Sequence, residues 1–163
     1  MEWKKIDDFE NYSISSEGEV RNDKFDRILN PSNDKDGYLR VCLYKNGKKK
    51  THYVHRLVAS AFIPLENGKD FVDHKDGEPT NNSVENLRWC NLKENNQNKS
   101  IAKNNTSGIK GVRFDRGKWC ARIWIDGKHI YLGYFESIEE AAAVRSARAN
   151  QVFGVFTNAC ESV

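Results

Sequence analysis

The clearest alternation of apolar and polar residues lies in residues 38–54, which read YLRVCLYKNGKKKTHYV. Leu39, Val41 and Leu43 fall on one side of an extended strand, as the period of two in a β-strand requires. Asn46-Gly47 then separates two such runs, and this dipeptide is the strongest short signal of a β-hairpin. The pattern therefore predicts a hairpin over residues 38–54.

The segments on either side of this hairpin carry weaker patterns. Residues 55–62, HRLVASAF, place apolar side chains at helical spacing before Pro64, so they predict a short packing helix. Residues 1–30 contain a Glu17-Gly18 turn before a short strand at Val20, but their apolar residues are too sparse for a core of their own. We interpret residues 1–30 as an accessory motif.

Residues 108–163 form a second patterned region, after a polar and aperiodic linker at residues 101–107. A capping box formed by Ser137 and Glu140 opens an alanine-rich helix. Before that helix, two turn dipeptides, Arg116-Gly117 and Asp126-Gly127, separate three predicted strands: residues 111–114, 118–125 and 128–135.

The alternation in this predicted sheet assigns its two faces. The inward residues, which we expect to face the helix, are Trp119, Ala121, Ile123, Ile125, Ile130, Leu132 and Phe135. The outward residues are Lys118, Cys120, Arg122, Trp124, His129 and Tyr131. Basic and aromatic groups that alternate on an exposed sheet are suited to binding a nucleic-acid groove.

Residues 72–98 are crowded with Asp, Asn and Gly, which are common turn residues. A short apolar strand ends at Asp73-His74, and a turn at Asp76-Gly77 follows. Residues 84–90 can form a second strand, and Asn91 with Glu94 makes a capping box for a helix through about Lys99. The predicted local order is strand, loop, strand, helix.

Composition and charge narrow the class of protein. At a mean hydropathy of −0.77, a chain of 163 residues suits small modules better than one large core. The four cysteines never form a C-x-x-C pair, so we expect neither a structural zinc nor a disulfide framework. No window approaches the ~18 apolar residues of a membrane span. We expect no membrane partner and a cytoplasmic location, in the host cell if a phage or virus encodes the protein.

Three residues of the central stretch carry the chemistry of phosphodiester hydrolysis. The imidazole of His74 has an ordinary pKa near ~6.5 and is suited to act as a general base for water. The Asp73 carboxylate and the Asn95 amide are hard ligands for one Mg²⁺ or Mn²⁺ ion. Adjacent strand residues point to opposite faces, so Asp73 and His74 share a site only if the strand bends, and the Asp76-Gly77 turn favours such a bend.

The run DHKDG…NN…ENLRW…KEN resembles the HNH endonucleases, in particular the phage and intron-encoded homing type in which the last His of the motif is Asn. The opening WKKIDDFENYSISSEGEVRN resembles a segment that accompanies these enzymes, the NUMOD4 motif. The resemblance implies a ββα-metal fold, and it implies that Asn86 braces the loop and His74 without touching the metal.

The run SGIKGVRF…GKWCARIWIDGKHIYLGYFESIEEAAA resembles the AP2 domain, over about residues 107–156. Arg122 stands where plant members often have an acidic residue, so the base preference does not transfer. The resemblance implies DNA contacts from Lys110, Arg113, Lys118, Arg122, Trp124 and Tyr131.

Several alternatives stay open at this stage. Lys48, Lys49 and Lys50 on the hairpin either contact phosphate or keep an edge strand soluble. Arg88 either binds phosphate or covers Trp89. A metal role for His52 and His55, three residues apart, is weaker than packing or phosphate contact.

The prediction is a modular α+β protein: a NUMOD4-like motif (1–30), a β-hairpin plus ββα-metal unit (31–100), and an AP2-like three-stranded antiparallel sheet on one helix (108–163). It would act as a metal-dependent, site-specific DNA endonuclease, a monomer that nicks one strand of double-stranded DNA. The main alternative is a non-catalytic AP2-type DNA-binding regulator with a vestigial HNH unit. An RNA-directed protein is less favoured because the exposed sheet resembles a DNA reader.

Overall fold

The computed structural model describes residues 1–98, 101 and 104–157. The chain divides into two compact units, Met1–Asn95 and Asn96–Val163. The predicted helix end at Lys99, part of the predicted linker and Cys160 lie outside the described residues. The described part is α+β and built from small antiparallel sheets, as predicted.

The N-terminal residues form a four-stranded antiparallel sheet in the order β1-β2-β3-β4. Sequence patterns predicted only the short strand near Val20. Few of the residues are apolar, but those few, including Phe9 and Ile14, pack against other elements and need no core within the motif. The strands are β1 (Trp3–Ile6), β2 (Phe9–Ser15), β3 (Val20–Asn22) and β4 (Arg27–Ile28).

The predicted hairpin is confirmed as β6 (Leu39–Lys45) and β7 (Lys48–Tyr53), with β5 (Ser32–Asn33) on the edge of β6. Asn46 has φ 52° and Gly47 φ 74°, as a two-residue hairpin turn requires. The chain passes directly into α1 (Val54–Phe62), which ends before Pro64.

The predicted order of strand, loop, strand and helix is also confirmed, as β8 (Phe71–His74), β9 (Leu87–Cys90) and α2 (Leu92–Gln97). The second strand is shorter than predicted, because Leu87 N–H bonds Val84 O at 3.3 Å in a turn. Asn91 and Glu94 form the predicted capping box: each side chain accepts the other residue's backbone N–H, at 2.9 and 2.8 Å.

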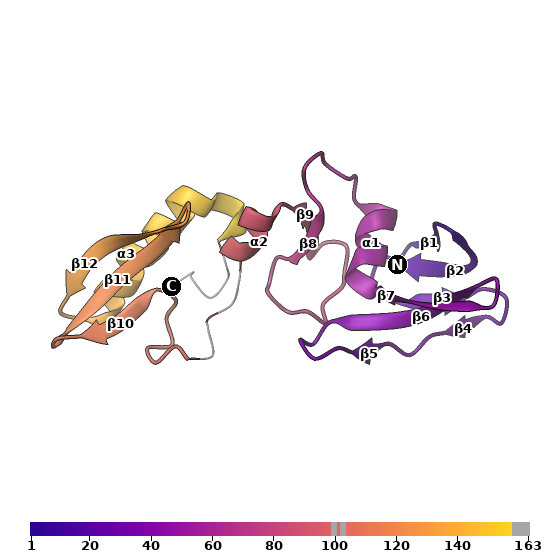
Figure 1. The fold of residues 1–163 in the computed structure, drawn as a ribbon, viewed down its shortest axis with the longest axis horizontal. Coiled ribbons are helices and arrows are strands. Elements are labelled where there is room, and N and C mark those ends of the chain that lie inside the picture. Colours follow the sequence, from indigo (N-terminus) through magenta and orange to yellow (C-terminus); the bar gives the residue numbers. More distant parts are fainter. Residues whose placement is uncertain (99–100, 102–103, 158–163) are drawn as a thin grey trace. The chain divides into compact units, whose positions relative to one another are not determined.

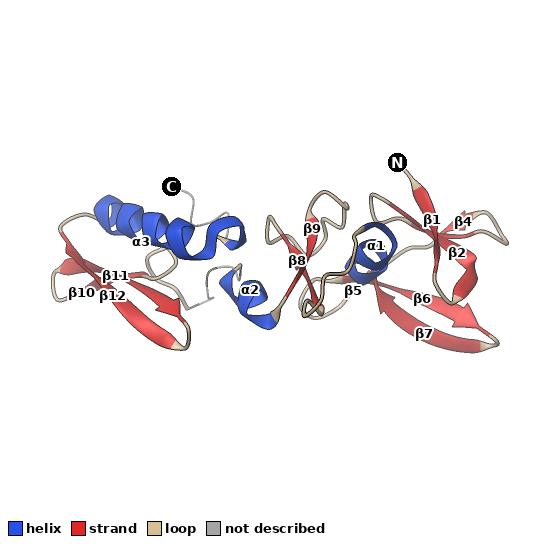
Figure 2. Ribbon diagram, turned by 90° about the horizontal axis from the view of Figure 1, so that it is seen from above, coloured by secondary structure: helices blue, strands red, loops and turns tan. Residues whose placement is uncertain are grey.

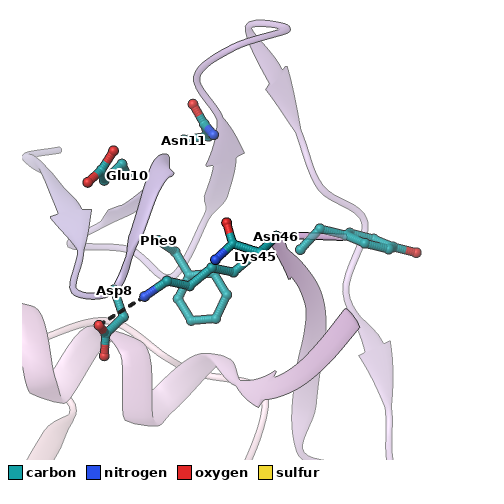
Figure 3. Close-up of a pocket in the computed structure, with 7 residues that line it drawn as sticks. Asp8, Phe9, Glu10, Asn11, Lys45 and Asn46 are labelled. Atoms are coloured by element: carbon teal, nitrogen blue, oxygen red, sulfur yellow. Dashed lines mark hydrogen bonds and ion pairs between the residues drawn. The ribbon is translucent and has the colours of Figure 1, made fainter. Parts of the chain in front are cut away.

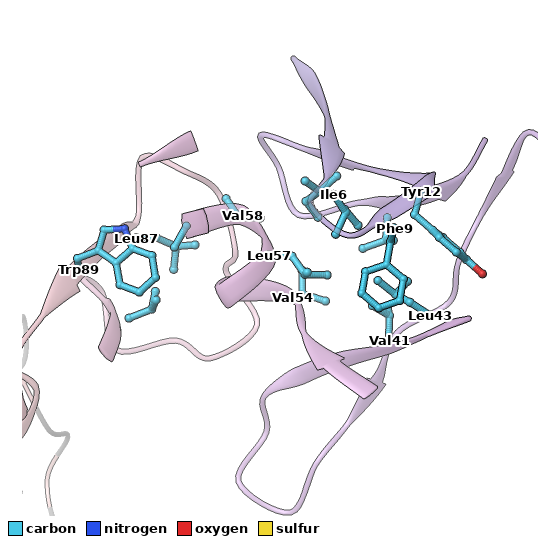
Figure 4. Close-up of a cluster of buried hydrophobic side chains, with 14 residues drawn as sticks. Ile6, Phe9, Tyr12, Val41, Leu43, Val54, Leu57, Val58, Leu87 and Trp89 are labelled. Atoms are coloured by element: carbon cyan, nitrogen blue, oxygen red, sulfur yellow. The ribbon is translucent and has the colours of Figure 1, made fainter. Parts of the chain in front are cut away.

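Helix α1 is the centre of the core of Met1–Asn95, and Figure 4 shows the side chains that surround it. Val54 and Val58 are fully buried, and the helix contacts β1, β2, β6, β7, β8 and β9. Ile14 from β2, Leu43 from β6 and Leu87 from β9 belong to the same apolar cluster. One core therefore unites the N-terminal sheet, the hairpin and the β8–β9 pair.

In the second unit, a three-stranded sheet packs one face against α3 (Ile138–Phe153), as Figures 1 and 2 show. Ser137 caps α3, because its Oγ accepts the N–H of Glu140 at 3.1 Å. Ala121 and Ile123 are buried against the helix, which confirms the predicted inner face. The remaining elements are β10 (Val112–Asp115), β11 (Lys118–Ile125), β12 (Lys128–Phe135) and the 3-10 turn η1 (Gly154–Phe156).

Two residues of this sheet differ from the prediction. Ile130, expected inside, is 38% exposed, and Cys120, expected outside, is buried. The register shifts between Ala121, which pairs with Gly133, and Arg122, which pairs with Tyr131. This bulge leaves Leu132 as an extra residue, so Tyr134 pairs with Cys120 and Phe135 with Trp119. Ile130 pairs with buried Ile123 and so keeps the inner side, although it is exposed. Cys120 does lie on the outer side, but its larger strand partners Arg113 and Tyr134 flank it.

Within the described residues, no helix is long and apolar enough to cross a membrane.

Because the two units have separate apolar cores, we expect each unit to unfold in its own transition. Ile14→Ala should lower the free energy of unfolding of Met1–Asn95 by about 2–5 kcal/mol, because it removes a fully buried side chain, and leave the second unit unchanged. Urea titration followed by the indole N–H signals of Trp89 and Trp119, one in each unit, measures both transitions. Ile123→Ala should show the converse pattern, and a loss shared equally by both signals would contradict the division.

Candidate active site and DNA-binding face

His74 is the last residue of β8 and is only 6% exposed. Its ring lies among aromatic neighbours, 5.8 Å from the ring of Tyr38 and 5.2 Å from that of His55. Its Nε2 is 3.1 Å from Oδ1 of Asn82, whose Nδ2 donates to the carbonyl of Thr80 at 3.2 Å. With the amide in this orientation, Nε2 carries the hydrogen and Nδ1 has the basic lone pair.

Asp73 lies opposite Arg88 in the register of β8 and β9, and it is as buried as His74. Oδ2 accepts a hydrogen bond from Arg88 Nε at 2.7 Å, and Arg88 Nη2 lies 2.6 Å from the same oxygen as an ion pair. The guanidinium balances a carboxylate that would be costly to bury alone. Arg56 lies over the Trp89 ring at 6.0 Å, while the guanidinium of Arg88 is ion-paired with Asp73.

The bend expected at Asp73 and His74 falls later in the chain. The β8–β9 register is regular through His74, and the turn begins only where the His74 carbonyl accepts the N–H of Gly77 at 2.9 Å. The turn starts at the last residue of β8, where strand alternation no longer fixes the direction of the His74 side chain. The Tyr38 ring contacts that of His74, and burial with the charges of Asp34, Asp36 and Asp73 raises the Tyr38 pKa.

Asn86 makes its side-chain bonds inside the loop that joins β8 and β9. Its Nδ2 donates to Asp76 Oδ1 at 2.9 Å and to the Asn81 carbonyl at 2.8 Å, and its Oδ1 accepts the Asp76 N–H at 3.2 Å. Burial acts to raise the pKa of Asp76, but hydrogen bonds from Glu78, Asn81 and Asn86 lower it overall. These contacts give Asn86 a bracing position in the loop.

Asn95 is half-buried on α2, and its N–H bonds the Asn91 carbonyl at 3.0 Å. Near the start of this helix, burial and the charges of Asp73 and Glu94 raise the pKa of the Cys90 thiol to about 12. The charges of Arg88 and Lys69 act on the thiol in the opposite direction, so carboxylates and cations both lie near the junction of β8, β9 and α2.

The side chains of Asp73 and Asn95 are chemically suited to a divalent cation. A carboxylate and an amide oxygen are hard ligands suited to Mg²⁺ or Mn²⁺. The described residues contain no group of three His, Cys, Asp or Glu side chains placed to hold a metal ion. An ion held by Asp73 and Asn95 would therefore complete its coordination with water and substrate phosphate oxygens.

The two other histidines of this unit pack against aromatic rings. The ring of His52 stands edge-on to Phe9 at 5.0 Å, and that of His55 is 5.4 Å from Tyr53. Burial, with the charges of His74 and Arg56, lowers the pKa of His55 to about 3. His55 is therefore a neutral ring beside His74.

The lysines at the hairpin tip are exposed, as phosphate contact requires. Lys48 and Lys50 line a shallow pocket between this tip and the turn that joins β1 to β2. Figure 3 shows a second pocket that shares Asp8, Phe9, Lys45 and Asn46 with it, where Lys45 Nζ bonds Asp8 Oδ1 at 3.1 Å. Lys49 lies between Lys48 and Lys50 on β7 and is opposite Tyr44 in the strand register.

The outer face of the C-terminal sheet presents three of the six predicted contact residues openly. Arg122 is exposed, Trp124 is 54% exposed, and Tyr131 is 57% exposed. The other three are engaged: Lys118 bonds Glu136 at 2.6 Å, Arg113 bonds Asp115 at 3.2 Å, and half-buried Lys110 donates to the Gln97 carbonyl at 2.9 Å.

Sequence reasoning missed three residues near these sites. Tyr134 is 44% exposed and donates to Asp115 at 2.7 Å on the outer face, where the bulge in β12 places it. Gly133 inside that strand is a signal of such a bulge. Tyr38 and Asn82 reach His74 only through the tertiary fold.

The strand pair β8–β9 followed by α2, with Asp-His at the end of the first strand, defines a ββα nuclease unit. Residues 1–44 match the NUMOD4 motif, and residues 52–97 match the family described as HNH endonuclease. The chain belongs to the HNH homing endonuclease family, with a NUMOD4 motif at its N-terminal end.

Individual relatives agree with this assignment. The chain is 42% identical over 139 residues to an uncharacterized HNH endonuclease, L245, of Acanthamoeba polyphaga mimivirus, covering 85% of this chain and 39% of that protein. It is 46% identical over 99 residues to DNA endonuclease I-HmuI of Bacillus phage SP01, covering 60% and 57%. The chain thus spans less than two thirds of each of these relatives.

A solved structure supports the same assignment. The structure described as "DNA binding and cleavage by the HNH homing endonuclease I-HmuI" matches with a TM-score of 0.57 and 48% identity, over 60% of this chain and 57% of that one. The mimivirus match, at 139 residues, is longer than the region up to residue 97 and therefore extends into the C-terminal unit.

The low pKa of His55 predicts acid sensitivity. The unfolded chain binds a proton at His55 below about pH 6.5, whereas the folded chain does so only near pH 3. Between these values the free energy of unfolding should decrease as the pH is lowered, by about 1.4 kcal/mol per pH unit from this group. Asp23, whose pKa is lowered to about 2, reduces the free energy of unfolding only below about pH 4, because its carboxylate is ionised in both states above that pH.

His55→Phe keeps an aromatic ring and removes the titration. Urea unfolding measured from pH 7 to pH 4.5 should show a shallower loss of stability in this variant than in the wild type. Parallel pH profiles for the two proteins would contradict a buried neutral His55.

Proposed function

We propose that this chain is a metal-dependent, site-specific DNA endonuclease that nicks one strand of double-stranded DNA and leaves a 5′ phosphate and a 3′ hydroxyl. The observation that supports it most is the buried pair at the end of β8, His74 held in one tautomer and Asp73 beside Arg88. I-HmuI, a relative that is 46% identical, is named as a DNA endonuclease.

In this proposal His74 is the general base. Nε2 is engaged by Asn82, so Nδ1 accepts the proton of a water molecule as the water oxygen attacks phosphorus. The bond from phosphorus to the 3′ oxygen breaks, and the leaving oxygen takes a proton from solvent. Neutral His55 beside the base adds no positive charge that would repel the proton as it moves to His74.

The other residues of the site would hold the metal ion, balance charge and brace the loop. Asp73 and Asn95 would hold one Mg²⁺ or Mn²⁺, which supplies positive charge at the scissile phosphate and the leaving oxygen. Arg88 compensates the Asp73 carboxylate when no substrate is present, and it would contact a phosphate of bound DNA. Asn86 braces the loop that follows His74.

The C-terminal unit provides DNA affinity in this proposal, as an AP2-like domain. Arg122, Trp124 and Tyr131 lie exposed on the sheet face that α3 leaves uncovered. Lys110, Arg113 and Lys118 would exchange their present partners for phosphates, and Lys48, Lys49 and Lys50 would contact the backbone from the hairpin. One active site per chain cuts one strand, so a monomer on DNA is sufficient for a nick.

His74→Ala should reduce metal-dependent nicking by roughly 10²–10⁴-fold, because a positioned general base contributes about that much. Supercoiled plasmids with a randomised insert serve as substrate, and the nicked circles are sequenced to find the target. Resealing by DNA ligase tests for a 5′ phosphate and a 3′ hydroxyl. His52→Gln, another histidine of the same unit, should nick at the wild-type rate.

Two results would contradict the enzyme. Nicking that is unchanged in His74→Ala would remove the base from the mechanism. Binding to the plasmid without nicking in Mg²⁺ or Mn²⁺ would favour a DNA-binding regulator.

Arg122→Ala should weaken binding to the nicked target and reduce the dependence of log K on log salt by about 1, because one phosphate contact is lost. Trp124→Ala should also weaken binding, with little change in the nicking rate at saturating protein. Arg148→Ala on α3, which removes the same charge from the helix side, should leave affinity unchanged. Equal losses from Arg122 and Arg148 would indicate non-specific charge attraction instead.

A further inference from the structure

The turn between β2 and β3 packs directly on the loop that orients His74. Gly18 has φ +88°, and a Cβ at this position would lie 2.8 Å from the Cβ of Asn82 and 3.4 Å from its carbonyl oxygen. Carbon atoms do not approach that closely, so any side chain at Gly18 must displace Asn82. Only glycine permits both this φ and this approach.

The turn is itself rigidly held. Ser15 is fully buried, and its Oγ accepts the backbone N–H groups of Glu17 and Glu19 at 3.3 and 2.9 Å. The backbone N–H of Gly18 bonds the Ser15 carbonyl at 3.1 Å. The neighbouring Ser16 carbonyl accepts the N–H of Val84 at 2.8 Å, so the turn also bonds the backbone of the His74 loop.

Asn82 is the link between this turn and the imidazole. Its side chain is almost completely buried, with Nδ2 on Thr80 and Oδ1 on His74 Nε2. A buried amide with both ends engaged has one orientation, because reversing it would place two donors or two acceptors together. The tautomer of His74 therefore depends on where Asn82 is held.

We propose that Asn82 is a positioning residue for His74, and that the β2–β3 turn of the NUMOD4 motif is the clamp that holds Asn82 in place. This proposal rests on the proposed function of His74 as general base. It gives the NUMOD4 motif a part in the geometry of the cleavage site, in addition to any contact it makes with DNA.

The first test changes the acceptor at position 82. Asn82→Asp keeps an oxygen for Nε2–H, whereas Asn82→Leu is of similar size and offers none. ¹⁵N NMR of the histidine rings at about pH 9, well above the ordinary imidazole pKa of about 6.5, reports which nitrogen carries hydrogen. The His74 signals are assigned by their loss in His74→Gln.

The expected result separates the two variants. Wild type and Asn82→Asp should show His74 with hydrogen on Nε2, and Asn82→Leu should show a mixture of tautomers. The nicking rate at saturating protein should fall at least about tenfold in Asn82→Leu, with unchanged affinity for DNA, and less in Asn82→Asp. A merely structural Asn82 would instead give two variants with the wild-type tautomer, or equal losses in both.

The second test concerns the clamp. Gly18→Ala and Gly68→Ala both place alanine at positive φ, +88° and +78°, so both carry a similar backbone strain. Only the first meets Asn82, because nothing lies within 4 Å of a Cβ at Gly68. Gly18→Ala should disturb the His74 tautomer and slow nicking at least about tenfold, while Gly68→Ala does neither.

The readouts keep this proposal separate from the proposed function. A His74 ring with hydrogen on Nε2 in both Gly18→Ala and Asn82→Leu would overturn the clamp, whether or not the protein cuts DNA. If the tautomer changes as expected but no variant and no wild-type protein nicks plasmid, the positioning stands and the nuclease function fails.

Discussion

The structure of residues 1–95 depends on the burial of one short helix between two groups of strands. Val54 and Val58 of α1 are fully excluded from water, and the apolar cluster around them draws side chains from β2, β6 and β9. No one of these segments has enough apolar residues to form a core alone. The N-terminal motif, the lysine hairpin and the ββα unit therefore fold as one body, although they are distinct segments in the sequence. The backbone bond from Val84 to Ser16 joins the first of these to the last.

The polar site lies at the end of β8, where Asp73 and His74 are buried. A buried polar group needs a partner, so each ion pair and hydrogen bond there affects stability. Asp73 is ion-paired with Arg88, and Asn82 hydrogen-bonds the His74 ring. Both depend on neighbours contributed by other segments: Arg88 by β9, Asn82 by a loop that the β2–β3 turn supports. The residues that carry out the proposed chemistry are few, but the residues that fix their protonation and orientation span much of the unit.

Turn dipeptides, capping residues and strand alternation were sufficient to predict several elements. The Asn46-Gly47 hairpin, the Asn91–Glu94 capping box, the Ser137 cap and the inner face of β11 all have the predicted form. Residues that depend on tertiary contacts were not predictable. The N-terminal strands use a core supplied by later residues, the bulge at Leu132 changes which residues of β12 are exposed, and the Arg88 partner follows from a cross-strand register. Asp73, His74, Asn86 and Asn95 were selected from the sequence, whereas Asn82 and Tyr38 required the fold.

The N-terminal sheet and the loop around His74 should open and close as one cooperative structure. Native-state hydrogen exchange measures this at three backbone amides: Ser15, which bonds the Glu19 carbonyl; Val84, which bonds Ser16; and Lys75, which bonds Asn86. All three should exchange with the same free energy of opening, that of global unfolding of this unit. Exchange of Val84 and Lys75 through a much lower opening free energy, while Ser15 stays protected, would contradict it.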